Sequence, residues 1–153
     1  MASLVDRWQA RLWAFARVLS GNDEAAWEIV QETWVSVVAN LDSLHDAARF
    51  RTWVFSIARH KYVDSVRKWQ RLEQAKTSVS ATRAVNATSE SGDIRDILGL
   101  LPEQDRSILA LHYLDGFEYQ EMAGILGVPV GTVKSRLHKA RTELKSVLEQ
   151  AND

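Results

Sequence analysis

Apolar residues recur every three to four positions from the start of the chain, which is the spacing of amphipathic helices. The first stripe contains Leu4, Val5, Trp8, Leu12, Phe15, Ala16 and Leu19. Gly21 follows this run, and glycine is the usual residue just beyond a helix end. Asn22 or Asp23 then offers a side-chain oxygen to cap another helix. The pattern predicts one helix over residues 4–19 and a second that starts beside Asn22.

Two further stripes follow. The second contains Ala26, Val30, Thr33, Trp34, Val37, Val38 and Leu41, opposite a polar face of Glu28, Gln31, Glu32 and Ser36. The third contains Phe50, Val54, Ile57, Ala58, Tyr62, Val66 and Trp69, and the polar side of that helix is basic. No proline, the strongest helix breaker, precedes Pro102. We therefore expect three helices in the first half of the chain, the third over residues 50–69.

Residues 76–92 lack this periodicity. They are rich in serine and threonine, and their only large apolar residues are Val79 and Val85, which indicates a flexible linker. Apolar spacing resumes at Ile94, and Pro102 suits the first residue of a helix that Gly116 closes. The expected fold is all-α. It consists of two small helical domains, a three-helix domain over 1–71 and a helix-turn-helix domain over 94–153, joined by a linker over 72–93.

Residues 119–137 carry the most specific local pattern. A short predicted helix meets Gly127, and a second helix begins just after Pro129. Ala123 is small enough to let the second helix cross closely, and Gly127 suits the left-handed conformation of a tight turn. Val133 is expected to point into the angle between the two helices. This spacing indicates a helix-turn-helix.

The outer face of the second of these helices has the chemistry of a DNA-reading helix. At about 100° per residue, Ser135 and His138 lie opposite the apolar side, with cations beside them. Short polar side chains reach base edges in the major groove, and cations neutralise phosphates. The candidate DNA-binding residues are Thr132, Lys134, Ser135, Arg136, His138, Lys139 and Arg141. A solvated amphipathic helix would explain the charge equally well, but the turn spacing favours DNA binding.

A second basic surface lies on the third predicted helix. Residues 49–68 contain six cations and one acid, Asp64, for a local net charge of +5. Trp53 shares a face with Ile57, His60 and Asp64, so its ring is a candidate for stacking on bases beside a positive groove. The alternative is that Trp53 belongs to the core and the charges are solvated. Two basic helices in two domains suggest two contacts along one duplex.

The total charge hides this pattern. The 153 residues carry a formal net charge of −1, which as an average argues against nucleic-acid binding. Residues 130–147 carry +4, however, and residues 94–129 carry −4, so the total describes two basic faces with acidic surface elsewhere. The sequence shows no catalytic constellation, phosphate-binding glycine loop or metal-ligand spacing, and we expect neither catalysis nor a cofactor.

The composition also bounds the compartment. The absence of cysteine excludes disulfides, thiol catalysis and thiolate zinc sites. No apolar run approaches the roughly 20 residues of a membrane span, and the first residues lack the layout of a signal peptide. We expect a cytoplasmic protein without direct membrane insertion.

Several motifs together resemble the extracytoplasmic-function (ECF) sigma factors of the sigma-70 family. Those similar to region two are 50–59 (FRTWVFSIAR) and 64–68 (DSVRK), with the polymerase-binding helix over 23–25 (DEA) to 30–34 (VQETW). Those similar to region four are 101–103 (LPE), 113–116 (YLDG) and 127–141 (GVPVGTVKSRLHKAR). The likeness covers nearly the whole chain in the family's order.

The resemblance implies a dissociable RNA polymerase subunit that directs the enzyme to promoters. It implies core RNA polymerase, promoter DNA and an anti-sigma factor as partners, and no small-molecule substrate. The polymerase-binding residues would be Glu28, Gln31, Glu32 and Trp34. The minus-ten residues would be Arg49, Trp53, Arg59, His60, Lys61, Asp64, Arg67 and Lys68, with the loop from Leu44 to Arg49. The recognition helix named above would read the minus-thirty-five element.

Two departures from the family pattern bear on promoter choice. His60 stands where the family usually has asparagine, and the loop over 42–48 is short. Two other functions remain open from the residues. The first is a helix-turn-helix regulator that needs no polymerase, which the tryptophan-rich first domain and the acidic second helix argue against. The second is an interaction protein whose domains clamp a partner helix.

Overall fold

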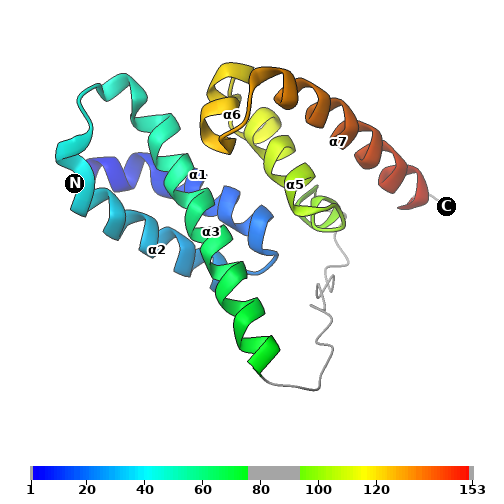
Figure 1. Cartoon of the computed structure of the whole chain (residues 1–153), viewed down its shortest axis with the longest axis horizontal. Coiled ribbons are helices and arrows are strands. Elements are labelled where there is room, and N and C mark those ends of the chain that lie inside the picture. Colours follow the sequence, from blue (N-terminus) through cyan, green and yellow to red (C-terminus); the bar gives the residue numbers. More distant parts are fainter. Residues whose placement is uncertain (1, 76–93, 152–153) are drawn as a thin grey trace.

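The computed structural model describes residues 2–75 and 94–151, and all of its regular elements are helical. The first half contains α1 (Ala2–Ser20), α2 (Asp23–Asn40), the short turns η1 (Leu41–Ser43) and η2 (Ala47–Arg49), and α3 (Phe50–Ala75). The second half contains α4 (Ile94–Leu98), α5 (Glu103–Leu109), the π-helical turn η3 (Ala110–Leu114), α6 (Tyr119–Leu126) and α7 (Val130–Ala151). Figure 1 shows α1–α3 beside α5–α7. The all-α prediction is confirmed.

The predicted helices are present, with shifted ends. α3 continues to Ala75, beyond the predicted end at Trp69 and four residues into the segment 72–93 expected as a linker. The rest of that segment, 76–93, lies outside the described residues. Pro102 precedes α5 with an extended ψ of 152°, so the helix begins one residue later than predicted. None of the helices in the described ranges is long and apolar enough to cross a membrane.

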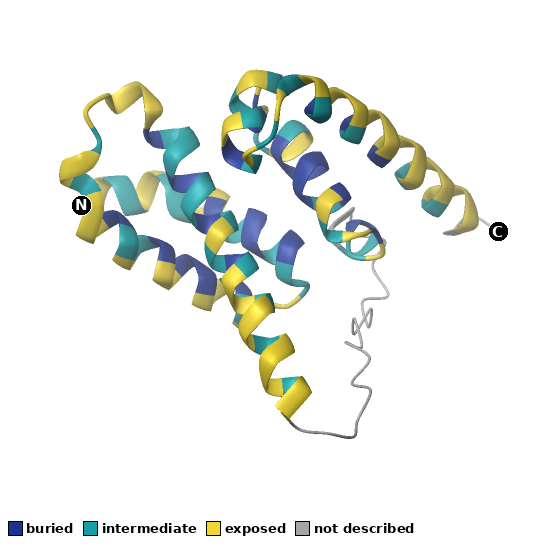
Figure 2. Ribbon diagram, viewed as in Figure 1, coloured by how far each residue is buried: buried dark blue, intermediate teal, exposed yellow. Residues whose placement is uncertain are grey.

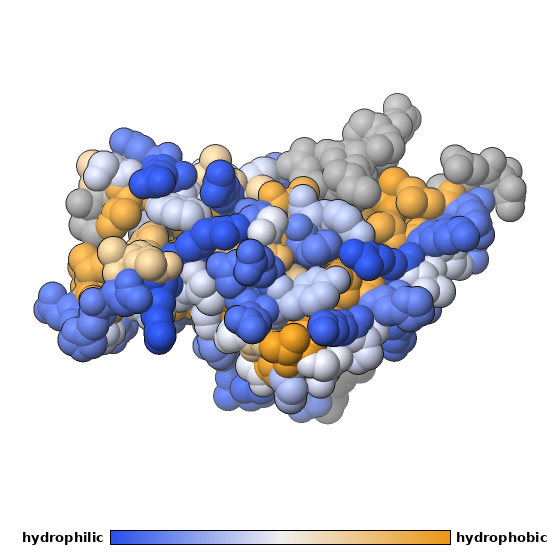
Figure 3. Space-filling model, turned by 90° about the horizontal axis from the view of Figure 1, so that it is seen from above, coloured by the Kyte–Doolittle hydropathy of each residue, from blue (hydrophilic) through white to orange (hydrophobic). Residues whose placement is uncertain are grey.

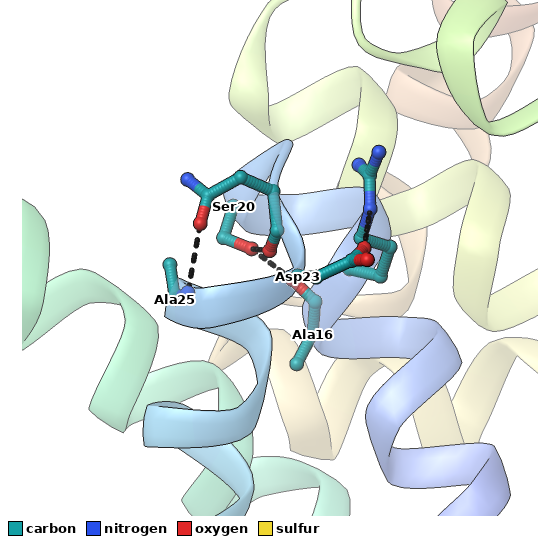
Figure 4. Close-up of polar contacts among 6 residues, drawn as sticks. Ala16, Ser20, Asp23 and Ala25 are labelled. Atoms are coloured by element: carbon teal, nitrogen blue, oxygen red, sulfur yellow. Dashed lines mark hydrogen bonds and ion pairs between the residues drawn. The ribbon is translucent and has the colours of Figure 1, made fainter. Parts of the chain in front are cut away.

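The turn between α1 and α2 follows the sequence prediction. Gly21 has a φ of +82°, a conformation that glycine adopts without strain. The Ala25 N–H donates to the Asn22 side-chain oxygen at 2.8 Å, which makes Asn22 the N-cap of α2 (Figure 4). Arg17 Nε donates to Asp23 Oδ1 at 2.8 Å across the same turn. These contacts hold α2 against α1.

Each half of the chain contributes to one continuous core. Leu12, Phe15 and Leu19 of α1 are buried against α2 and α3, and Figure 2 shows the buried positions on the facing sides of the helices. Phe55 of α3 is fully buried although it lies outside the predicted stripe, because the second domain covers that side of the helix. Val38 was predicted in the apolar stripe of α2, but it is 61% exposed. Its prediction as a core residue is wrong.

Candidate nucleic-acid interface

The turn between α6 and α7 has helix-turn-helix geometry. Gly127 has a φ of +69°, and its N–H donates to the Ala123 carbonyl at 2.9 Å. The Val128 N–H donates to the same carbonyl at 3.1 Å, which ends α6 sharply. Val133 is fully buried in the angle between the helices. The predicted roles of Gly127 and Val133 are confirmed.

The predicted reading face of α7 is turned to solvent. Lys134, Ser135, His138 and Lys139 are exposed, and Thr132 and Arg136 at the two flanks are half-buried. The outer side of α7 is open along its length (Figure 2). The Ser135 hydroxyl lies 3.3 Å from the Gly131 carbonyl and 3.2 Å from the Thr132 carbonyl, so it donates to the backbone of its own helix. Its lone pairs remain available to accept a hydrogen bond from a base amino group.

Arg141 differs from the other predicted contacts on α7. Its Nε donates to the Tyr113 hydroxyl at 2.6 Å, and its Nη2 lies 3.3 Å from His112 Nε2. The hydrogen bond to Tyr113 raises the pKa of Arg141 above its ordinary value, although the side chain is exposed. η3 therefore fixes the direction in which this cation points.

Asp105 of α5 lies behind the recognition helix. Only 5% of the residue is exposed, and burial raises the pKa of its carboxyl group. The nearby Lys139 ammonium acts in the opposite direction, and Glu143 adds to the rise. Lys139 thus has an acid on the protein side and solvent on the other.

The basic face of α3 brings most of the predicted minus-ten residues together. Counting about 100° per residue, Trp53, His60, Lys61, Asp64, Arg67 and Lys68 fall on one side of the helix. A groove of about 330 Å³ between α2 and α3 is lined by Trp53, Ile57, His60, Lys61 and Asp64, together with Ser36, Asn40 and Ser43. Arg49, whose side chain is 82% exposed, lies in η2 at the start of the same helix.

Trp53 combines its two predicted roles. It is half-buried, and its ring lies 6.0 Å from that of Phe50, which is part of the core. Trp53 also lines a second groove, of about 940 Å³, between the 43–49 turn and α6. One side of the ring therefore supports the fold while part of it borders open surface.

Arg59 lies apart from the other predicted minus-ten residues. It is about 120° around α3 from Trp53, on the side that faces the second domain. Its Nη2 lies 3.7 Å from Glu103 Oε1 of α5, and its side chain is only 16% exposed. Arg59 is therefore turned away from the groove.

The predicted polymerase-binding face of α2 contains more apolar surface than the sequence indicated. Glu28, Gln31 and Glu32 are exposed as expected, and Trp34 is half-buried against the core. Trp27 is also 44% exposed and Val35 is 70% exposed. Both residues are apolar but lie outside the predicted stripe, which was the available signal. Acidic and apolar side chains thus alternate on one open helix face.

Asp115 lies where the two domains meet. Its carbonyl accepts a hydrogen bond from Arg51 Nη2 of α3. Burial raises the pKa of its carboxyl group to about 6, although Arg11 and Arg51 act in the opposite direction. The Oδ2 atom is buried and accepts no hydrogen bond from the described residues. At neutral pH the ionised carboxylate therefore has too few hydrogen bonds to offset its loss of hydration.

Asp115→Asn should change how stability depends on pH. Because the pKa of Asp115 is higher in the folded protein than in the unfolded chain, protonation of this carboxyl stabilises the fold. This stabilisation is complete below about pH 4 and is lost as the pH rises through 6. The free energy of unfolding of the wild type should therefore fall by about 1–2 kcal/mol more than that of the variant between pH 4 and pH 7. This figure is reduced for solvent screening because the carboxyl is partly exposed. Urea unfolding across this range measures the difference. Asp6→Asn, on the exposed side of α1, is the control, and equal profiles for both variants would contradict the assignment.

Comparisons with known proteins match both halves of the chain. The family model for Sigma-70 region 2 matches residues 4–72, and that for Sigma-70, region 4, matches residues 91–144. The chain is 37% identical over 142 residues to the ECF RNA polymerase sigma factor EcfG of Rhodopseudomonas palustris, covering 90% of this chain and 78% of that one. The chain belongs to the sigma-70 family, as an ECF sigma factor.

Two other relatives extend the likeness of this sigma factor. SigW of Bacillus subtilis is 27% identical, covering 96% of this chain and 88% of that one. The solved structure of the sigma factor RpoE in complex with the anti-sigma factor NepR from Bartonella quintana is similar with a TM-score of 0.80 and 28% identity. The superposition covers 97% of this chain and 98% of that one, so it includes both domains. Sigma factors bind core RNA polymerase and promoter DNA to start transcription, and they are not known as enzymes.

Proposed function

We propose that each exposed face of this sigma factor has a separate task in initiation. The outer face of α2, with Glu28, Gln31 and Glu32, binds core RNA polymerase. The groove and basic face of α3 hold the minus-ten element. The exposed face of α7 reads the minus-thirty-five element. In this proposal the working units are residues 1–71 and 94–153, joined through 72–93, and the protein acts in the cytoplasm without a catalytic step of its own.

The observation that carries the proposal is the pair of exposed basic helix faces in two different domains. The α3 face adds a half-buried aromatic ring and a groove to its cations, which suits a strand whose bases are unstacked. The α7 face presents hydroxyl and imidazole groups flanked by cations, which suits the major groove of a duplex. The match to region 2 over residues 4–72 disfavours a helix-turn-helix regulator that works without polymerase.

Strand opening would depend on binding energy rather than on chemistry. Extruding a base costs a few kcal/mol of stacking and pairing, which contacts in a pocket offset. Trp53 and His60 border the groove in which such a base would be held. Arg67 and Lys68, exposed further along the same face, would grip the backbone. Arg59 is not part of this contact while it is paired with Glu103.

We also infer an anti-sigma partner. The Bartonella quintana relative is in complex with the anti-sigma factor NepR, and CnrH, another similar sigma factor, is in complex with the cytosolic domain of CnrY. This chain superposes on the first over nearly its full length.

In vitro transcription on a fragmented genomic library tests the proposal. Core polymerase with this protein should produce start sites that core polymerase alone does not, and the DNA upstream of those starts should share two separated elements. Starts that do not change when the protein is added would overturn the proposal.

The double variant Glu28→Lys/Glu32→Lys should weaken binding to core polymerase. Both side chains are exposed, so the fold should be unaffected, but two reversed charges change the field of the proposed contact face. We expect at least about tenfold weaker binding at low salt, or about 1.4 kcal/mol, and a smaller difference at high salt. Fluorescence titration of core polymerase measures it. Asp6→Lys/Glu149→Lys, which reverses two exposed charges elsewhere, is the matched control; an equal loss in both would rule out a specific role for the α2 face.

A further inference from the structure

A groove of about 670 Å³ lies at the end of the molecule where α1 begins. Its apolar lining includes Leu4 and Trp8 of α1, Leu44 and Ala48 of the turn between α2 and α3, and Phe50 of α3. We call it the Trp8 groove. Figure 1 shows the first turns of α1 beside the turn that joins α2 to α3. The groove is separate from the two grooves that Trp53 lines on the other side of that turn.

The charged residues that line the Trp8 groove are Arg7, Arg11 and Arg51. Arg7 and Arg11 are exposed, and their guanidinium carbons lie 6.0 Å and 5.4 Å from the centroid of the Trp8 ring. Arg51 is instead paired with Glu121 and with the Asp115 carbonyl. At this end of the molecule, on the left of Figure 3, hydrophobic residues lie beside strongly hydrophilic ones. Two exposed cations therefore flank one half-buried indole.

A row of aromatic rings connects the Trp8 groove to the proposed minus-ten surface. The centroids of the Trp8 and Phe50 rings are 6.0 Å apart, and those of Phe50 and Trp53 are also 6.0 Å apart. Leu44 lines both the Trp8 groove and the groove of about 940 Å³ that Trp53 borders. The turn over 41–49 therefore forms a shared wall, with a groove and an aromatic ring on each side.

The chemistry of the Trp8 groove suits a nucleotide of a single strand. An aromatic ring offers a face on which any base can stack, and adjacent cations bind the phosphates on either side of it. The volume lies within the range of about 300–1,000 Å³ that small-ligand sites occupy. An acidic peptide would also meet Arg7 and Arg11. The row of rings that leads to Trp53 favours the strand, because a strand held at Trp53 needs only to cross the turn to reach Trp8.

We propose that the Trp8 groove holds a second unstacked base of the strand whose first base is held beside Trp53. This inference rests on the proposed function. The base stacks on Trp8, and Arg7 and Arg11 bind the phosphates that flank it. The strand passes over the 41–49 turn with one base on each side. Strand opening then draws binding energy from two separated base contacts, which together offset the cost of unstacking.

Photocross-linking from single positions of the strand tests this site. A promoter identified from its start site is prepared as a set of templates, each with one 5-iodouracil in the non-template strand within or beside the minus-ten element. On irradiation this base cross-links to an aromatic side chain against which it lies. We expect the holoenzyme to cross-link through Trp53 from one position and through Trp8 from another. Mass spectrometry of the digested complexes identifies the residue.

The cross-linking outcomes separate this inference from the proposed function. Initiation accompanied by cross-links to Trp53 but not to Trp8 would overturn the second site and leave the proposed function intact. Equal cross-linking to Trp8 from every position would overturn it too, because it would mean contact without a defined site. A holoenzyme that neither initiates nor cross-links would contradict the proposed function, and the second site with it.

An abasic nucleotide at the position that cross-links to Trp8 tests for stacking. With wild-type protein it should shorten the lifetime of the open complex at least about fivefold, the low end of the range for one base on an aromatic ring. Trp8→Leu should shorten the lifetime similarly on the intact strand and add nothing on the abasic strand. Trp8→Phe keeps a ring and should stay close to wild type. A loss by Trp8→Leu that is equal on both strands would mean a purely structural role beside Phe50 and would overturn the stacking.

The double variant Arg7→Gln/Arg11→Gln tests the phosphate contacts. On a forked template with a single-stranded minus-ten region and no minus-thirty-five element, the slope of log affinity against log salt should fall by about 1.4, since each single-strand contact contributes about 0.7. Arg7→Gln alone, which leaves Arg11 beside the Asp115 carboxyl, should lower it by about 0.7. Lys145→Gln, exposed on α7, is the control and should leave the slope unchanged. A double variant with the wild-type slope would overturn the assignment of these arginines to the strand.

Discussion

Replacing Phe55 by alanine should lower the free energy of unfolding by about 3–5 kcal/mol, the range for a large aromatic side chain removed from a packed core. Phe55 is fully buried between Phe15 and Phe117, which belong to different domains. The cavity would therefore open at the junction of both halves. Urea unfolding followed by tryptophan fluorescence and by far-ultraviolet circular dichroism measures the loss.

Phe55→Leu provides the matched control because it keeps most of the buried volume. The leucine variant should lose much less free energy of unfolding than the alanine variant. A loss under about 1 kcal/mol in the alanine variant would contradict the placement of Phe55 at the centre of the core.

The double variant Lys134→Ala/Lys139→Ala should weaken binding of the reconstituted holoenzyme to promoter DNA by about 30-fold at physiological salt. Two lost phosphate contacts lower the slope of log affinity against log salt by about 2, since each contributes about 0.9. Both side chains are exposed, so the free energy of unfolding should change little, through the loss of the Lys139 charge near Asp105. Filter binding across a salt series measures slope and affinity together, with Lys145→Ala, further along α7, as the control.

Ser135 should behave differently from the lysines. A hydroxyl that meets a base edge specifies sequence, so Ser135→Ala should alter the order of preference among promoters while leaving the salt slope unchanged. An equal loss on every promoter would count against base reading at this position. The two kinds of variant therefore separate affinity from specificity on one helix.

Features set by local sequence were predictable. The Asn22 cap, the left-handed Gly127 and the buried Val133 each depend on neighbours within a few residues, and the structure has all three. The 3.6-residue period likewise placed the outer face of α7 correctly.

Features set by the contact between the domains were not predictable in the same way. Periodicity gave Phe55 and Arg59 no special status, because their partners Phe117 and Glu103 are distant in the sequence. Arg59 was grouped with the DNA-binding cations on charge, yet in the structure it faces an acid. The exposed Val38 shows the converse: an apolar residue at helical spacing can lie on the surface rather than in the core.

The near-zero total charge has a structural meaning. The +5 of residues 49–68 is divided between the two sides of α3, and the cations on one side meet acids of the −4 segment. The other cations of residues 49–68 lie on the groove side of α3, and a second set of cations lies on α7. A chain of net charge −1 can therefore hold two DNA-binding faces while its domains attract one another.

Run-off transcription from one promoter, in intact form and with its minus-thirty-five element scrambled, tests the central claim that separate helices read separate elements. Wild type and Ser135→Ala are compared on both templates with core polymerase. The account predicts that scrambling the element and changing Ser135 each reduce initiation, and that combining them reduces it no further. Fully additive losses, with the variant equally impaired on both templates, would contradict the assignment of α7 to the minus-thirty-five element.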